Sequence, residues 1–250
     1  MSRFHTTLIV AAILGGAALA AHQFVLCSAV ILALFVAIGF GVAIPQMRFF
    51  GPFICRGSNS KKQIALTFDD GPDTNSTPQL LELLREEKIE AAFFCVGKKI
   101  EVNPELARQI LRDSHLLENH SYAHSNFTNF FSATKLQNEL ACAQNTIQVA
   151  TNTTSKFFRP PIGLSNPTTF RVAKKMNLQI IGWSVRSLDT VIASPQKIVA
   201  RVARKLHPGA IILLHDGNIP AEKLVVTVKL LLATLRELGY EVARLDKILK

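Results

Sequence analysis

Two neighbouring carboxylates, Asp69 and Asp70, stand in the segment 67–72, which reads Thr-Phe-Asp-Asp-Gly-Pro. Adjacent carboxylates can divide their work, because one can bind a cation while the other stays free as a base. The same letters also describe a turn that closes a strand, since Asp, Gly and Pro are common turn residues. The dipeptide alone leaves a catalytic pair and a plain turn as alternatives.

A second candidate pair, His120 and His124, lies four positions apart in His-Ser-Tyr-Ala-His. On a helical turn this spacing would place both imidazoles on one side, where they can chelate one metal ion. Adding Asp70 gives two nitrogens and one oxygen, a set typical of a catalytic divalent metal with positions left for water and substrate. We expect zinc, with cobalt or another transition metal as alternatives, and Asp69 as the base that activates water.

Three further side chains allow both a chemical and a structural interpretation. Arg159 stands in Arg-Pro-Pro, where it can hold a carboxylate by a bidentate contact or be an exposed loop arginine. His215 follows an apolar run and can serve as a general acid near neutral pH or cap the strand. Trp183, the only tryptophan, can line a substrate pocket or pack in a core.

The elements that must position these residues begin after Lys62, where short apolar runs alternate with amphipathic stretches. Strands separated by helices predict parallel pairing with right-handed crossovers. Our prediction is an α/β fold, a distorted, incomplete (β/α) barrel of about seven parallel strands, with an open doubly wound sheet as the alternative. The predicted strands are Gln63–Asp69, Ala91–Gly97, His115–Ser121, Phe157–Pro161, Leu178–Val185, Ala210–Asp216 and Tyr240–Leu245.

Several predicted helices share one start signal, a capping side chain followed by proline. The last helix carries apolar residues at helical spacing from Leu224 to Leu238 and should end at Gly239. The predicted starts are Thr77-Pro78, Asn103-Pro104, Asn166-Pro167 and Ser194-Pro195.

The candidate chemical residues fall at the carboxyl ends of the predicted strands. In parallel α/β folds these ends share one edge, where chemistry gathers. They should therefore meet at one site. The residues at these ends are Asp69 and Asp70 (first strand), His120 (third), Arg159 (fourth), Asp189 (just past the fifth) and His215 with Asp216 (sixth).

The N-terminal region has a different composition. Thr6–Ala21 and Phe24–Pro45 are uncharged and mostly apolar, and the second run can cross a hydrocarbon core of ~30 Å as a helix. The first is either a secretory signal, with Ala18–Ala20 as a cleavage site, or the first arm of a helical hairpin. We predict one or two membrane segments in residues 1–48, a basic linker at 49–62 and a catalytic domain at 63–250.

Charge indicates lipid as the partner of this region. Residues 1–62 hold five basic and no acidic side chains, in a chain of formal net charge +10. A basic, acid-free stretch beside apolar runs indicates a lipid bilayer. No stripe of basic and aromatic residues of the kind that grips single strands follows, so we expect no nucleic-acid binding. The sequence indicates no protein partner.

The order of the motifs resembles that of the polysaccharide deacetylases of carbohydrate esterase family four, from about Lys61 to Lys250. The resemblance implies a metal-dependent hydrolase that removes N-acetyl groups from an amino-sugar polymer or oligomer like peptidoglycan or chitin. It also implies roles for individual residues. These are Asp69 as base, Arg159 as its support, His215 as general acid and Asp189 as its orienting partner, Asp70, His120 and His124 as metal ligands, and Pro161, Ile162, Trp183 and Leu214 as substrate-binding positions.

The sequence departs from the family pattern at several positions. Ile162 replaces a frequent aromatic residue, Arg186 and Thr190 replace a frequent Asp and Trp, and Glu118 replaces a frequent Gly. These changes leave the metal site and the acid–base pair intact but bear on substrate preference. An O-acetyl carbohydrate esterase and a non-catalytic, membrane-tethered carbohydrate-binding protein remain the alternatives.

The side of the membrane on which the domain works is left open by two opposing arguments. If both runs span, the positive-inside rule places the domain in the cytoplasm. An acetylated wall polymer as substrate favours the extracytoplasmic side.

Overall fold

The computed structural model describes residues 2–58 and 60–249, and its central strand is β1 (Gln63–Asp69). β1 pairs in parallel with β2 (Ala92–Cys95) on one side and β7 (Ile211–His215) on the other. The sheet order is β5-β4-β3-β2-β1-β7-β6, with β8 also paired to β1. The other strands are β3 (Leu116–Asn119), β4 (Phe157–Phe158), β5 (Gln179–Ile180), β6 (Val185–Arg186) and β8 (Glu241–Val242).

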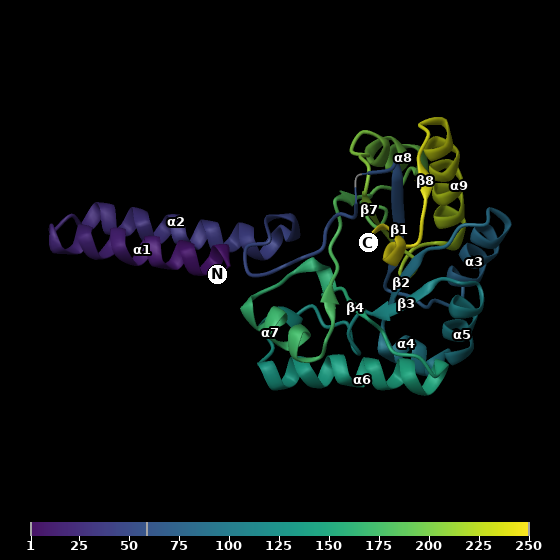
Figure 1. The fold of residues 1–250 in the computed structure, drawn as a ribbon, viewed down its shortest axis with the longest axis horizontal. Helices are drawn as coiled ribbons and strands as arrows, with labels where there is room; N and C mark the ends of the chain where they lie inside the picture. Colours follow the sequence, from purple (N-terminus) through teal and green to yellow (C-terminus); the bar gives the residue numbers. More distant parts are fainter. Residues whose placement is uncertain (1, 59, 250) are drawn as a thin grey trace.

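The predicted strand Leu178–Val185 is two strands in the structure. β5 pairs with β4 at one end of the sheet order, and β6 pairs with β7 at the other end. The chain therefore passes from one edge strand directly to the opposite edge strand. All of these pairings are parallel, and the curved sheet of Figure 1 confirms the predicted distorted, incomplete barrel.

Ile54 lies at the gap between β5 and β6, where it forms a parallel bridge to Ile181. Its N–H donates to the carbonyl oxygen of Ile180, and its own carbonyl accepts from the N–H of Gly182, both at 2.9 Å. Ile54, upstream of the predicted domain, therefore pairs with the segment that connects β5 to β6.

The helices surround the barrel, as Figure 1 shows. Three of the four predicted proline starts are confirmed, and Asn166 forms a full capping box with Thr169. The fourth start differs by one position, because Ser76 is the N-cap and Thr77 is already helical. The helices are α3 (Thr77–Glu86), α4 (Gly97–Val102), α5 (Pro104–Arg112), α6 (Ala133–Thr151), α7 (Pro167–Lys175), α8 (Pro195–Ala203), α9 (Ala221–Glu237) and α10 (Leu245–Ile248).

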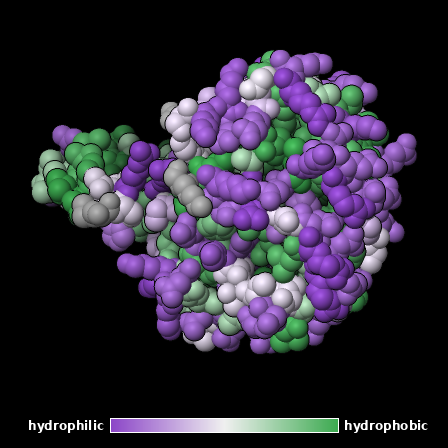
Figure 2. Space-filling view, turned by 45° about the vertical axis from the view of Figure 1, so that its right-hand side comes forward, coloured by the Kyte–Doolittle hydropathy of each residue, from purple (hydrophilic) through white to green (hydrophobic). Residues whose placement is uncertain are grey.

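Two N-terminal helices, α1 (Arg3–Ala20) and α2 (Phe24–Ala43), form a hairpin that projects from the barrel (Figure 1). Its apolar side chains face outward, with Val25 87% exposed, and Figure 2 shows this surface as predominantly hydrophobic. Both helices are long and apolar enough to cross a membrane, and a signal sequence has the same properties.

The segment between the hairpin and β1 packs against the domain. Phe53 and Cys55 are 2% and 4% exposed and belong to a cluster that includes Phe158 and Ile180. Part of the predicted linker is therefore structural core.

Candidate active site

The end of β1 presents its two carboxylates in different directions. Asp69 is the last strand residue, and Asp70 has a left-handed backbone, with φ of 71°. The next residue must be glycine, because a Cβ on Gly71 would lie 2.1 Å from Oδ2 of Asp216. The sharp turn thus aims Asp69 and Asp70 at separate partners. The turn is confirmed, and it leaves each carboxylate beside a different set of side chains.

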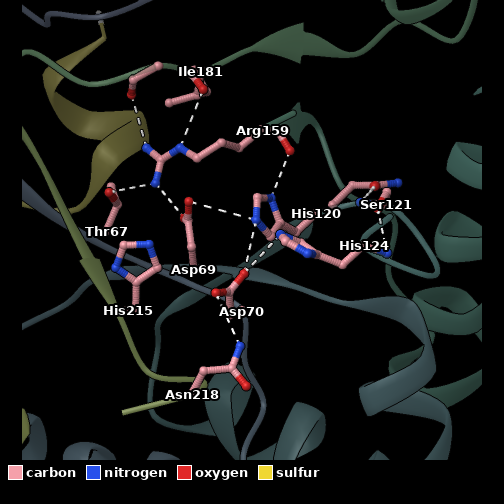
Figure 3. A network of polar contacts seen from close by, with 12 residues as sticks. Thr67, Asp69, Asp70, His120, Ser121, His124, Arg159, Ile181, His215 and Asn218 are labelled. Carbon is pink, nitrogen blue, oxygen red and sulfur yellow. Dashed lines mark hydrogen bonds and ion pairs between the residues drawn. The ribbon is translucent and has the colours of Figure 1, made fainter. Parts of the chain in front are cut away.

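Asp70 lies beside both predicted imidazoles (Figure 3). Its Oδ1 is 3.4 Å from Nε2 of His120 and 3.1 Å from Nε2 of His124. One donor atom from each of the three residues lies within 4.8 Å of the others. Nδ1 of His120 lies 2.8 Å from the carbonyl oxygen of Arg159, to which it can donate, and this leaves Nε2 free as a ligand. The donor set fits one divalent ion.

The prediction of a helical turn for His120–His124 is wrong. Ser121 and His124 have φ of 64° and 50°, and side chains supply the hydrogen bonds of the turn. Oδ1 of Asn119 accepts from the Ser121 N–H at 2.8 Å, and Oγ of Ser121 accepts from the His124 N–H at 3.1 Å. Such local bonds compete with helix formation. The imidazole centroids still lie 4.8 Å apart.

Arg159 is fully buried, so the alternative of an exposed loop arginine is wrong. Nη1 donates to Oδ1 of Asp69 at 2.6 Å and to Oγ1 of Thr67 at 2.9 Å. Nη2 donates to the carbonyl oxygen of Gly182 at 3.0 Å. A buried guanidinium with satisfied donors holds Asp69 in one orientation and compensates its charge.

His215 lies on the opposite side of the two aspartates from His120 and His124 (Figure 3). Its Nδ1 lies 2.8 Å from Oδ1 of Asp189, and its backbone N–H donates to Oδ2 of the same carboxylate at 2.8 Å. Burial lowers the pKa of His215, but the hydrogen bond and negative charge of Asp189 outweigh it, so the pKa is raised. A raised pKa favours the protonated ring, which is the form that a general acid requires.

The imidazoles also affect Asp70. Burial would raise the pKa of this carboxyl group, but hydrogen bonds from His120 and His124 lower it well below its ordinary value. Asp70 is therefore held in its ionised, metal-binding form. The pKa of His124 is raised, because its contact with Asp70 outweighs the effect of burial.

A cavity of about 320 Å³ connects these groups. Its lining includes Asp69, Asp70, His120, His124 and His215. Ile162, 48% exposed, and Trp183 also line it. Leu214 does not, because strand residues alternate between faces. Leu213 faces the cavity, whereas Leu214 is fully buried in the main core. Pro161 is buried beside the cavity and is not among its lining residues.

Several residues of the site received no role from the sequence. Nδ2 of Asn218 donates to Oδ2 of Asp70 at 3.5 Å, and Thr67 supports Arg159. Asp216 is fully buried, where desolvation raises its pKa to about 7 against the opposing hydrogen bond from Thr77. The sequence could have marked Thr67 and Asp216, because Thr67 opens the Thr-Phe-Asp-Asp-Gly-Pro segment and Asp216 directly follows His215. Nothing in the sequence marks Asn218.

The barrel places three groups of side chains at one sheet edge: a carboxylate held by a buried arginine, an Asp–His–His set that could hold a metal ion, and a partly buried His–Asp pair. Residues 56–181 match the family model described as polysaccharide deacetylase. The chain belongs to the polysaccharide deacetylase family.

Named relatives agree with this assignment. The chain is 35% identical over 194 residues to a peptidoglycan-N-acetylglucosamine deacetylase of Bacillus cereus, covering 77% of this chain and 90% of the relative. It is 31% identical over 163 residues to a chitooligosaccharide deacetylase of Bradyrhizobium, covering 65% and 74%.

A solved structure of the family has the same fold, with a TM-score of 0.74 and 31% identity over 80% of this chain and 71% of that one. It is a mutant of a CE4 family pseudoenzyme with restored enzymatic activity. The fold therefore occurs both with and without activity, and the residues of the site must carry the functional argument.

Proposed function

We propose that this protein removes N-acetyl groups from an N-acetylated amino-sugar polymer or oligomer, of the peptidoglycan or chitin type. One observation carries the proposal: Asp69, the Asp70–His120–His124 triad and His215 all line one cavity, and buried Arg159 and Asp189 hold Asp69 and His215 from behind. The names of the relatives support the acetylated amino-sugar class.

In this proposal Asp70, His120 and His124 hold one divalent ion, preferably zinc, because two imidazoles and one carboxylate leave positions open. When bound, the ion supplies Lewis-acid polarisation and lowers the pKa of water. Asp69 is the base that takes a proton from the attacking water, and Arg159 fixes its orientation.

His215 completes the reaction by giving a proton to the departing amine, which would otherwise be a poor leaving group. Asp189 holds Nδ1 of the ring, so that Nε2 is the nitrogen left to deliver the proton. Trp183 and Ile162 form the apolar wall against which an acetyl group or sugar face can pack.

The experiment that tests the proposal is acetate release by purified protein from N-acetylglucosamine oligomers, with wild type beside Asp69→Asn. Release that requires an added divalent ion and is lost in Asp69→Asn is the expected result. Preference for an O-acetylated sugar would instead make the protein an esterase. No release from either substrate, with metal bound, would make it a carbohydrate-binding member of the family.

The placement of the protein is a further part of the proposal. We propose that α1 and α2 anchor the chain in a membrane and that the catalytic domain works on the extracytoplasmic side. We also propose that the catalytic unit begins near Phe53, not at Gln63, because Phe53 and Cys55 are buried in it. Protease accessibility of the C-terminus in sealed vesicles, or a C-terminal reporter fusion, determines the side.

A further inference from the structure

The positive charge of this protein is concentrated in two separate stretches of sequence. Residues 1–68 and 140–188 together contain 11 of the 28 Lys and Arg residues and none of the 18 Asp and Glu residues. The rest of the chain, with 17 basic and 18 acidic residues, is nearly neutral. The formal net charge of +10 thus arises entirely from these two stretches.

The two acid-free stretches meet at a second cavity, whose lining shares no residue with that of the catalytic cavity. Its volume is about 790 Å³, and its lining comes from the start of α1, the segment after α2, and α7 with β5. In Figure 1, α7 lies on the side of the barrel toward the open end of the helical hairpin. If α1 and α2 lie in a bilayer, this cavity is at the level of the lipid headgroups.

The lining combines an apolar floor with a cationic rim. Phe50, Leu178 and Ile180 are buried side chains of the floor. Arg171 and Lys174 lie on an exposed face of α7 at the rim. Arg171 donates only to Oγ1 of Thr168, at 3.2 Å, and neither cation has a carboxylate partner among the residues that the structure describes. Such exposed cations beside an apolar hollow suit a ligand that is both anionic and partly apolar.

The geometry points to a binding site for an anionic phospholipid. We propose that the phosphate lies between Arg171 and Lys174 and that the glycerol and upper acyl chain lie on the apolar floor. The volume is within the range of small-molecule sites, roughly 300–1,000 Å³. The inference rests on the proposed membrane anchor but not on the proposed catalytic activity.

The test uses the full-length protein in nanodiscs of equal parts dioleoyl-phosphatidylglycerol and dioleoyl-phosphatidylcholine, with bound lipids counted by native mass spectrometry. Phosphatidylglycerol should be enriched on the wild type. Arg171→Ala/Lys174→Ala should reduce the enrichment by about 25-fold, since each cation near an anionic surface contributes about 5-fold. The matched control is Arg204→Ala/Lys205→Ala, which removes the same charge from exposed positions at the end of α8.

A third variant separates a shaped site from general attraction. Gln179→Trp fills the cavity from its exposed rim without changing charge and should also abolish the enrichment. Equal enrichment in wild type and in the α7 double variant would overturn the proposal, as would equal losses in both double variants. Displacement of the lipid by millimolar inorganic phosphate would also overturn it, because the site would then recognise phosphate alone. Lipid enrichment is measured without acetate release, so the test does not depend on the proposed catalytic activity.

Discussion

The two halves of the catalytic cavity hold their histidines by opposite arrangements. On the metal side, the Nε2 atoms of His120 and His124 converge on one carboxylate oxygen, that of Asp70. On the acid side, Nδ1 of His215 contacts the carboxylate of Asp189, and among the described residues no hydrogen bond or ion pair involves its Nε2. Three converging donors bind a cation, whereas a linear ring–carboxylate pair controls a proton. The same two residue types are thus arranged for different chemistry, and the arrangement of their donor atoms makes the difference.

Removing a converging donor should have the largest effect. His120→Ala is expected to lose the bound metal and to lower acetate release at least about 1,000-fold, because the ion contributes several kcal/mol of charge stabilisation. Metal analysis and acetate assays on the same preparation check both losses. His207→Ala, a change before the start of β7 and outside the cavity lining, should alter neither. A His120→Ala protein that keeps its metal and its rate would remove the distinction between the halves.

Removing the acid-side ring should lower the rate without loss of metal. His215→Ala is expected to reduce acetamide cleavage by about 100- to 10,000-fold. Cleavage of an aryl acetate should fall much less, because its leaving group needs no proton. Equal losses on the amide and the ester would contradict a proton-donor role.

A smaller, pH-dependent effect should follow from Asp189→Asn. The contact with Asp189 raises the pKa of His215, so losing the carboxylate charge should lower that pKa. The donor then deprotonates at lower pH, and the basic limb of the kcat/KM profile should move to lower pH. Above the new pKa, activity falls by about tenfold per pH unit. A basic limb that stays in place would assign it to another group.

The smallest effect should come from Gln46, at the junction between the helical hairpin and the barrel. Nε2 of Gln46 donates to the carbonyl oxygen of Trp183 at 2.7 Å, so this residue supports the wall on the acid side. Gln46→Ala is expected to raise KM by about 2- to 10-fold, the range of one net hydrogen bond, with kcat and metal content unchanged. Gln23→Ala, at the far end of the hairpin, is the matched control and should leave KM unchanged. Loss of metal in Gln46→Ala would contradict this expectation, because Gln46 would then support both the metal side and the acid side of the catalytic cavity.

The sequence predicted the parts of this fold that depend on local patterns. β1 was placed to the residue, and Asp69, His120, Arg159 and His215 were placed at one sheet edge, because parallel strands align their carboxyl ends. The helix starts at Pro104, Pro167 and Pro195 followed from the fixed φ of proline.

The parts that the sequence did not predict depend on tertiary context. Ser121 and His124 have a left-handed backbone conformation, which glycine usually adopts. Because neither residue is glycine, the sequence gives no sign of this turn. Leu178–Val185 is one apolar run whether it pairs with one neighbour or, as here, passes from one sheet edge to the other. The choice of Leu213 over Leu214 as cavity lining depends on strand register, which composition does not reveal.

The bridge between Ile54 and Ile181 bears on how this chain is made. Gln46 and Trp183, beside that bridge, are 137 positions apart. The ribosome therefore synthesises Gln46 and the hairpin long before Trp183 exists. Contacts of such long sequence separation form late, because the entropy of closing the loop must be overcome first. If the hairpin is the membrane anchor that we propose, it should insert before the barrel closes, and the final pairing should take place at the membrane surface, around an end already fixed in position.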